Sequence, residues 1–182
     1  MASSKSSPVV HTLRYGVLLA AMGWTAVALS GAKGGELTRG RSVAYVENKT
    51  YQAECTACHI GFLPGFLPAR SWTKMMNELE DHFGENAALD EEPRQEILAY
   101  LTANAADHPS STNRSKKIAK LIPADESPQR ITELAWWTRR HGSVREWVWK
   151  RKGVESKAKC NACHREADKG LFDEHDVQVP KE

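Results

Sequence analysis

Two copies of one five-residue pattern carry most of the chemistry of this sequence. Cys55-Thr-Ala-Cys-His59 and Cys160-Asn-Ala-Cys-His164 both read Cys-x-x-Cys-His, the attachment signature of c-type haem. On a helical turn, positions i, i+3 and i+4 share a face, so both thiols can reach the vinyl groups of a haem while the imidazole meets its iron. The sequence therefore predicts two covalent c-type haems, attached through Cys55, Cys58, Cys160 and Cys163, with His59 and His164 as axial iron ligands.

Three other uses of paired cysteines were weighed against haem attachment. A thioredoxin-like redox pair accompanies a βαβ pattern, whereas the segments around both motifs read as helical and charged. A zinc ribbon has closely spaced pairs, but Cys55 and Cys160 are 105 positions apart. Structural disulfides suit an exported chain, yet they do not explain a histidine directly after each pair. Bacterial c-type cytochromes mature outside the cytoplasm, so export favours haem.

The residue that faces each motif histidine decides whether the protein carries electrons or binds substrates. The pattern of residues 71–84, with Ser71 as N-cap, predicts a helix with His82 at its C-terminal end. Residues 131–142 predict a second helix, with His141 on its apolar face. We predict His82 and His141 as the distal iron ligands, each 23 positions from its motif histidine.

Other side chains compete for these roles. Met75 and Met76 are alternative ligands, although both lie in the middle of the apolar face of the helix predicted over 71–84, where Met side chains ordinarily pack in the core. His175, in an acidic segment, is a further candidate ligand. His108 precedes a proline and is expected to lie in a loop. Arg70 is a candidate partner for a haem propionate, with solvent as the alternative.

Histidine on both sides of each iron has a functional consequence. Imidazole supports Fe(III) better than a thioether does, so it lowers the reduction potential, and two ligands leave no open position for oxygen or peroxide. We therefore expect a low-potential carrier of single electrons and not an enzyme; persistent carbon monoxide binding at both haems would contradict this. The alternatives are a peroxidase-like or ligand-binding haem protein with one open iron, and a redox-sensing module anchored to a membrane.

The N-terminus has the charge order of a secretory signal peptide. Residues 1–15 are basic and Ser-rich, and an apolar run of 14 residues follows at 16–29, shorter than the roughly 20 residues that cross a bilayer. We expect cleavage after Ser30 or Ala32 and a periplasmic protein, with an uncleaved anchor as the alternative. The whole chain of 182 residues has a net charge of +2, too small for nucleic-acid binding through bulk electrostatics.

The remaining chain divides by composition. We expect a mostly α-helical fold with an N-terminal haem lobe at 33–106, a polar linker at 107–129 and a C-terminal haem lobe at 130–182. Residues 78–96 hold eight acids and one base, and residues 139–159 hold eight bases and two acids. Such an asymmetry is usually a solvated surface, but it could also orient two different partners.

Seven segments, in order along nearly all of the chain after the leader, resemble the small bacterial periplasmic dihaem cytochromes c: Glu54–His59, Leu67–Trp72, Asp81–Asn86, Arg130–Thr132, Arg140-His141, Val148–Lys150 and Cys160–His164. The resemblance implies two haem lobes, the first like a class I cytochrome c, with bis-histidine ligation through His82 and His141. It also implies electron transfer beside two partners, a membrane cytochrome b and an oxygen-binding monohaem cytochrome. We expect each distal histidine to serve the motif in its own lobe, with a crossed arrangement as the alternative.

Overall fold

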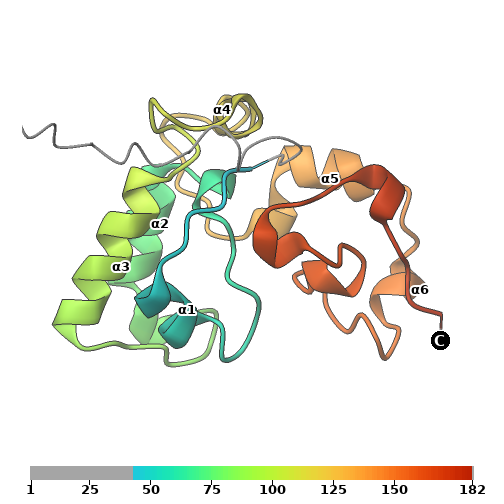
Figure 1. The fold of residues 1–182 in the computed structure, drawn as a ribbon, viewed down its shortest axis with the longest axis horizontal. Coiled ribbons are helices and arrows are strands. Elements are labelled where there is room, and N and C mark those ends of the chain that lie inside the picture. Colours follow the sequence, from blue (N-terminus) through green and yellow to red (C-terminus); the bar gives the residue numbers. More distant parts are fainter. Residues whose placement is uncertain (1–42, 182) are drawn as a thin grey trace, which may run out of the picture. The chain divides into compact units, whose positions relative to one another are not determined.

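The structure is a computed structural model, and it describes residues 43–181. Within this range it is helical and contains no β-strand, which confirms the expected mostly α fold (Figure 1). The predicted leader at 1–32 lies outside the described residues. The six α-helices of the described range are α1 (Lys49–Cys55), α2 (Ala69–Asn77), α3 (Glu91–Ala103), α4 (Asn113–Ala119), α5 (Ala135–His141) and α6 (Glu146–Trp149).

Helices α2 and α3 pack side by side and form the largest helical contact of the described chain (Figure 1). Trp72 and Met76 on α2 are buried, as are Ile97 and Leu101 on α3, and these i, i+4 pairs place apolar side chains on one face of each helix. The indole of Trp72 donates a hydrogen bond of 2.8 Å to the carbonyl of Pro64. This core fixes the loop that follows the first motif.

Helix α1 is the element that carries the first cysteine. It begins after Asn48, whose side-chain oxygen accepts a hydrogen bond of 2.6 Å from the backbone of Tyr51, a normal N-cap. The ring of Tyr51 lies 5.3 Å from that of Tyr100 on α3. Tyr51 also donates to the carbonyl of Phe62 at 2.8 Å. The α1–α3 contact therefore positions the end of α1, where the first motif starts.

The segment expected to be a linker contains a helix of its own. The hydroxyl of Thr112 accepts a hydrogen bond from the backbone of Ser115 and so caps α4. Ile118 and Ile122 are buried in the main core, and Ser115 packs so closely on Gly65 that a Cβ there would lie 2.5 Å from its hydroxyl oxygen. Residues 112–122 thus pack against the first half of the chain.

Residues 130–181 consist of short helices and turns, and their core is continuous with that of the first half. The ring of Phe66 stacks on that of Trp136, with ring centres 5.5 Å apart. The ring of Phe172 contacts the Phe66 ring edge-on, with centres 5.4 Å apart. Residues 43–181 accordingly belong to one compact unit. The boundaries of the two expected haem lobes stay predictions.

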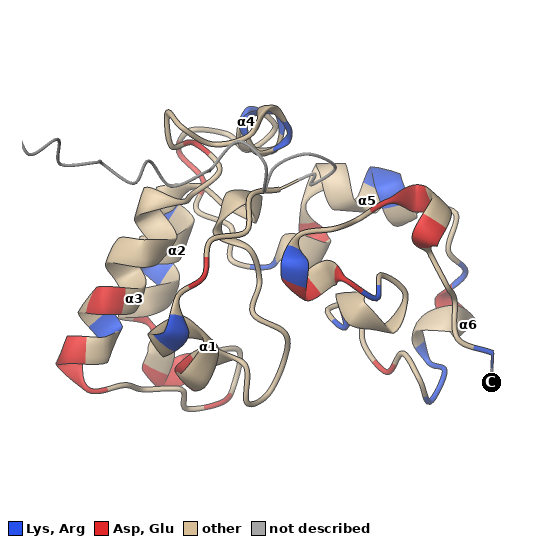
Figure 2. Ribbon diagram, in the orientation of Figure 1, with Lys and Arg blue, Asp and Glu red and all other residues tan. Residues whose placement is uncertain are grey.

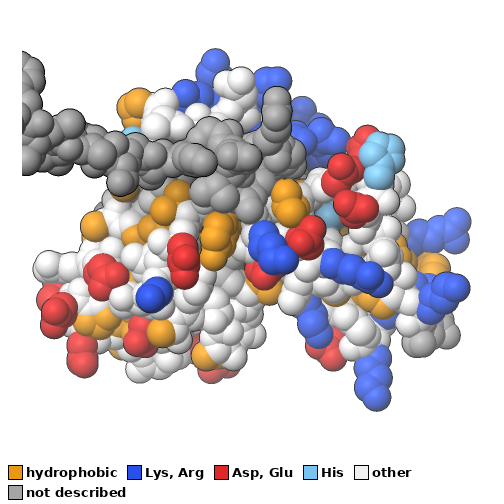
Figure 3. Space-filling view, viewed as in Figure 1, with side chains coloured by type: hydrophobic (Ala, Val, Ile, Leu, Met, Phe, Trp, Pro, Cys, Tyr) orange, Lys and Arg blue, Asp and Glu red, His pale blue; other side chains and the backbone are white. Residues whose placement is uncertain are grey.

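Charge is distributed unevenly over the described residues. Acidic residues mark the ribbon around the start of α3, whereas Lys and Arg recur along residues 139–159 (Figure 2). In the view of Figure 3, Lys and Arg side chains project from the part formed by the C-terminal residues. No helix within 43–181 is both long enough and apolar enough to span a bilayer.

Candidate haem sites

The first motif follows the end of α1 in a tight turn. Cys55 is the last residue of α1, and the hydroxyl of Thr56 donates a hydrogen bond of 2.6 Å to the carbonyl of Gln52. The imidazole of His59 has a fixed orientation, because its Nδ1 lies 2.7 Å from the carbonyl of Ile60 and its ring centre 5.0 Å from that of Phe62. A second-sphere acceptor on Nδ1 leaves Nε2 free to bind a metal.

The second motif forms its own turn of 3₁₀ helix, Cys160–Ala162. The backbone of His164 donates to the carbonyl of Cys160 at 2.8 Å, so the ends of the motif are close together. The ring of His164 lies 5.3 Å from that of Phe172. Burial lowers the pKa of His164, and His141 lowers it further; the imidazole is therefore held in the neutral form that binds iron.

The structure pairs each motif histidine with one of the two predicted distal histidines. The ring centres of His59 and His82 are 6.1 Å apart, and those of His141 and His164 are 6.2 Å apart. With about 2 Å for a metal–nitrogen bond and about 1.1 Å from a ring nitrogen to the ring centre, two imidazoles on opposite sides of one metal ion have centres about 6 Å apart. Both pairs have this spacing, and both lie within their own half of the chain.

The elements that carry the distal histidines differ from each other. His141 is the last residue of α5, as expected, although the helix predicted from residue 131 begins only at Ala135, after the 3₁₀ turn Ile131–Glu133. Its Nδ1 lies 3.0 Å from the carbonyl of Trp137. The predicted helix over 71–84, in contrast, is wrong at both ends: α2 begins after Pro68, Ser71 is buried within it, and it ends at Asn77. His82 follows the 3₁₀ turn Leu79–Asp81.

A local hairpin explains why α2 stops before His82. His82 and Glu85 exchange backbone hydrogen bonds of 2.7 and 3.3 Å, and the carboxylate of Asp81 accepts one of 2.9 Å from the backbone of Gly84. Phe83 and Gly84 have φ of +60° and +100°, which an α-helix does not allow. The hairpin turns the His82 ring towards His59. Burial lowers the pKa of His82, with smaller contributions from His59 and Arg130.

The competing side chains lie elsewhere. Met76 is a core residue and Met75 packs beside that core. His108 is in a turn, with its Nδ1 2.8 Å from the hydroxyl of Ser110. His175 is exposed at the rim of a cavity. The guanidinium of Arg70 donates to the carbonyls of Pro123 and Glu126, so it braces the segment after α4; its pairing with a haem propionate stays a prediction.

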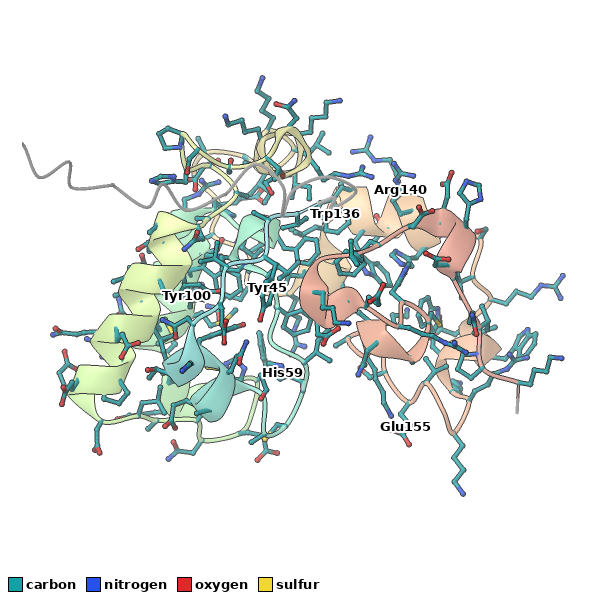
Figure 4. All side chains as sticks on the ribbon, viewed as in Figure 1. Tyr45, His59, Tyr100, Trp136, Arg140 and Glu155 are labelled. Carbon is teal, nitrogen blue, oxygen red and sulfur yellow. The ribbon has the colours of Figure 1, made fainter. Side chains whose placement is uncertain are left out.

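Each motif borders a cavity large enough for a planar cofactor. The first cavity, of about 780 Å³, has Cys58 and His59 in its wall. The second, of about 690 Å³, is bordered by Cys160, Cys163, His164 and His141 together. In Figure 4, Tyr45, Tyr100 and Glu155 belong to the wall of the first cavity, and Trp136 and Arg140 to that of the second. Each cavity thus has at least one motif thiol and the motif histidine in its wall, as a covalent haem at each motif requires.

Two of the four motif thiols lack the lowered pKa of an activated redox cysteine. All four are free. Burial raises the pKa of Cys55 to about 11 and that of Cys160 to about 11, whereas a reactive thioredoxin-like cysteine has a lowered pKa. Among residues 43–181, no group of three or more His, Cys, Asp or Glu side chains gathers at metal-binding distance. Free thiols in a Cys-x-x-Cys-His motif suit covalent haem attachment.

The ring contacts of His141 and His164 were not predicted from the sequence. Phe172 contacts His164, and Trp137 stacks on His141 with ring centres 4.2 Å apart and planes at 18°. The i, i+4 spacing of Trp137 and His141 could have indicated the stack. Nothing in the sequence links Phe172 to His164, because that contact depends on how residues 165–172 fold back.

The comparisons with known proteins agree with this geometry. A family model described as dihaem cytochrome c matches residues 51–172. Similar solved structures include a diheme cytochrome c from Rhodobacter sphaeroides, with 38% identity and a TM-score of 0.61 over 71% of this chain and 99% of that one. Another is a diheme cytochrome type c from Shewanella baltica OS155, with 34% identity and a TM-score of 0.61 over 75% and 95%.

Among curated proteins none matches this chain. The family match covers both Cys-x-x-Cys-His motifs and all four paired histidines, since its range runs from Tyr51 to Phe172. Both of these solved structures also share more than a third of their aligned residues with this chain. The chain therefore belongs to the dihaem cytochrome c family and carries two c-type haems.

Proposed function

We propose that this protein is an exported single-electron carrier in which His59 and His82 ligate the iron of one haem, the first haem, and His141 and His164 that of the other, the second haem. The observation that supports this is the equal spacing of the two histidine pairs, 6.1 and 6.2 Å between ring centres. Each pair joins one motif histidine to one histidine from elsewhere in the chain.

The side chains around these histidines hold them ready for ligation. A bound haem supplies a one-electron Fe(III)/Fe(II) couple whose potential its axial ligands set. The protein keeps His82 and His164 neutral by burying them, which lowers their pKa values. Carbonyl oxygens of Ile60 and Trp137 lie within hydrogen-bonding distance of Nδ1 of His59 and His141 and fix the ring orientation. Two imidazoles favour Fe(III), so the proposed potentials are low.

Replacing histidine by methionine tests this ligation. His82→Met and His141→Met each exchange an imidazole for a thioether, which raises the potential of a haem. In a potentiometric titration of the holoprotein, we expect each variant to raise one of two midpoint potentials and to leave the other nearly unchanged. Trp147→Phe, at a half-exposed ring outside both cavities, is the matched control. Unchanged potentials in both Met variants would contradict the proposed ligands.

We further propose that the protein passes electrons between a membrane cytochrome b and a soluble oxygen-binding monohaem cytochrome. The family resemblance supports the identity of these partners, and the charge asymmetry between residues 78–96 and 139–159 supports two different docking faces. Steering by such faces weakens as salt rises. The rate of electron transfer to a purified monohaem partner should therefore depend on ionic strength, and a rate that does not would remove the role of the charged faces.

The proposed location is the periplasm, with residues 1–32 removed as a signal peptide. The basic segment followed by a short apolar run supports this proposal, as does a cofactor that is attached outside the cytoplasm. N-terminal sequencing of the exported protein tests it. A start at Gly31 or Lys33 is expected, and an intact Met1 in the membrane fraction would identify an anchor instead.

A further inference from the structure

The two distal histidines are held with unequal firmness. His141 ends an α-helix, and its ring is stacked on that of Trp137, which is buried. Trp149 adds a second ring, with its centre 6.1 Å from that of His141. The Nδ1 contact with the Trp137 carbonyl restrains rotation of the imidazole. Helix, stack and hydrogen bond together oppose any withdrawal of His141 from the second haem.

His82 has none of these three supports. It lies in a turn outside the α-helices, and beside His59 its ring contact is with Phe83, at 4.7 Å. Phe83 occupies the left-handed region, with φ of +60°, which is unfavourable for a bulky side chain. The same ring is 44% exposed. The turn that presents His82 is therefore strained and open to solvent.

Besides its own hydrogen bonds, a distant part of the chain helps to hold this turn in place. The guanidinium carbon of Arg130 lies 4.1 Å from the ring centre of Phe83, a favourable cation–π geometry. The neighbouring Gln129 donates a hydrogen bond of 2.6 Å to the carboxylate of Glu78. Residues 129–130 thus contact the chain on both sides of His82, at Glu78 and at Phe83. Because both contacts are at the surface, they are weak enough to open.

Free space next to the turn would accept its movement. Glu80 and Asp81 are exposed, as are Phe83 to Asn86, so they leave little packing to disrupt. A Cβ built on Gly84 meets no atom within 4 Å. His82 can consequently swing away from His59 by a change in a few exposed residues, whereas His141 must first leave its stack on Trp137 and its contact with the Trp137 carbonyl.

We infer that the first haem has an exchangeable sixth position: His82 leaves the iron, a small neutral ligand binds in its place, and Arg130 is the latch that limits how often this happens. The inference rests on the proposed ligation by His82. The iron–nitrogen bond breaks with its electron pair retained by the imidazole, and the lone pair of the incoming ligand forms the new bond. Neither iron nor ligand is oxidised or reduced. At rest both irons keep two histidines.

Carbon monoxide added to the reduced holoprotein tests the exchange, because it binds ferrous haem wherever a position opens. The wild-type protein should bind one carbon monoxide per two haems, slowly, at a rate that does not depend on its concentration, since departure of His82 limits it. His82→Ala should still bind one, but fast and in proportion to concentration. His141→Ala should bind two, one at each haem.

These stoichiometries identify the exchanging haem. Two carbon monoxides bound by His82→Ala, or one by His141→Ala, would place the exchange at the second haem and overturn the inference. Absence of uptake by the wild-type protein would overturn it as well. That result would leave the electron-carrier proposal intact if both irons are low-spin, whereas a high-spin iron in the untreated protein would contradict the ligation itself.

The role of Arg130 has its own test. Arg130→Gln removes the contact with Phe83 and should speed carbon monoxide uptake about two- to fivefold, the factor that corresponds to a cation–π contact at an exposed site. Arg130 is at the surface, where it also pairs with Glu133, so the variant should fold. Arg139→Gln removes an exposed arginine two positions from His141 and should leave the rate unchanged. Equal rates in both variants would show that Arg130 is not a latch.

Discussion

Removing the Trp137 ring, which supports His141, should lower the free energy of unfolding far more than removing the Trp147 ring. Trp137 is only 7% exposed, and its ring contacts both His141 and Trp149. Truncating a buried Trp to Ala typically destabilises a protein by about 3–5 kcal/mol, and the stacking contact accounts for about 0.5–1.5 kcal/mol of such a loss. Trp137→Ala should therefore lower the free energy of unfolding by about 3–5 kcal/mol.

Trp147→Ala is the matched control, ten positions along the chain. That ring is 50% exposed, and its main contact is the guanidinium of Arg151, at 4.4 Å, so its loss should cost about 0.5–1 kcal/mol. Guanidinium chloride unfolding of both holoproteins, followed by far-ultraviolet circular dichroism, measures the difference, which we expect to be about 2–4 kcal/mol.

A second observable separates general destabilisation from an effect on the haem site. The backbone carbonyl that contacts Nδ1 of His141 survives in Trp137→Ala, so the imidazole keeps its hydrogen bond but loses its stack. We expect the absorption and EPR signals of one haem to change while those of the other persist. Equal unfolding free energies for Trp137→Ala and Trp147→Ala would refute the proposed support, and so would unchanged signals from both haems.

Two further changes test the fold and its pH dependence. Gly170→Ala should cost about 2 kcal/mol or more, because φ is +78° and the new Cβ would lie 2.7 Å from the carbonyl oxygen of Val43; Gly84→Ala, with φ of +100° and no neighbour, should cost about 1 kcal/mol. Equal losses of thermal stability would contradict the clash. Burial raises the pKa of Tyr100 to about 12 from its usual value near 10. The unfolded chain therefore loses the phenol proton at a lower pH than the folded protein does. The wild-type protein should consequently lose stability as pH rises from about 10 to about 12. Tyr100→Phe forfeits the hydrogen bond to the carbonyl of Val46, worth about 1 kcal/mol at neutral pH, but lacks this alkaline loss. The stability gap between the two proteins should therefore narrow with pH, and a constant gap would argue against the shifted pKa.

The chemistry of the site was more predictable than its supporting structure. Cys-x-x-Cys-His is a local pattern, so both attachment turns could be read directly from the sequence. The pairing of His82 with His59 and of His141 with His164 also followed from proximity along the chain, and the structure places these rings together. The ligand roles themselves stay predictions until a haem-loaded protein is measured.

Two differences between the expected and the observed local structure have identifiable physical causes. The helical spacing around His82 is genuine, but the backbone carbonyl of Leu79 accepts a hydrogen bond from Ala87, and this local closure of the hairpin replaces the last turn of the expected helix. Residues 107–129 have a polar composition, which masked the capping pair of Thr112 and Ser115 and the two buried residues Ile118 and Ile122. A local hairpin overrode the helical spacing in the first place, and long-range packing overrode the polar composition in the second.

Low-temperature EPR of the oxidised holoprotein, with the haem content counted on the same sample, tests bis-histidine ligation of both irons most directly. The geometry of the two histidine pairs predicts two haems per chain and two low-spin signals of bis-imidazole type. His82→Ala and His141→Ala should then each convert one signal to high spin. A high-spin iron in the unaltered protein would contradict the ligation and favour a haem enzyme with an open site.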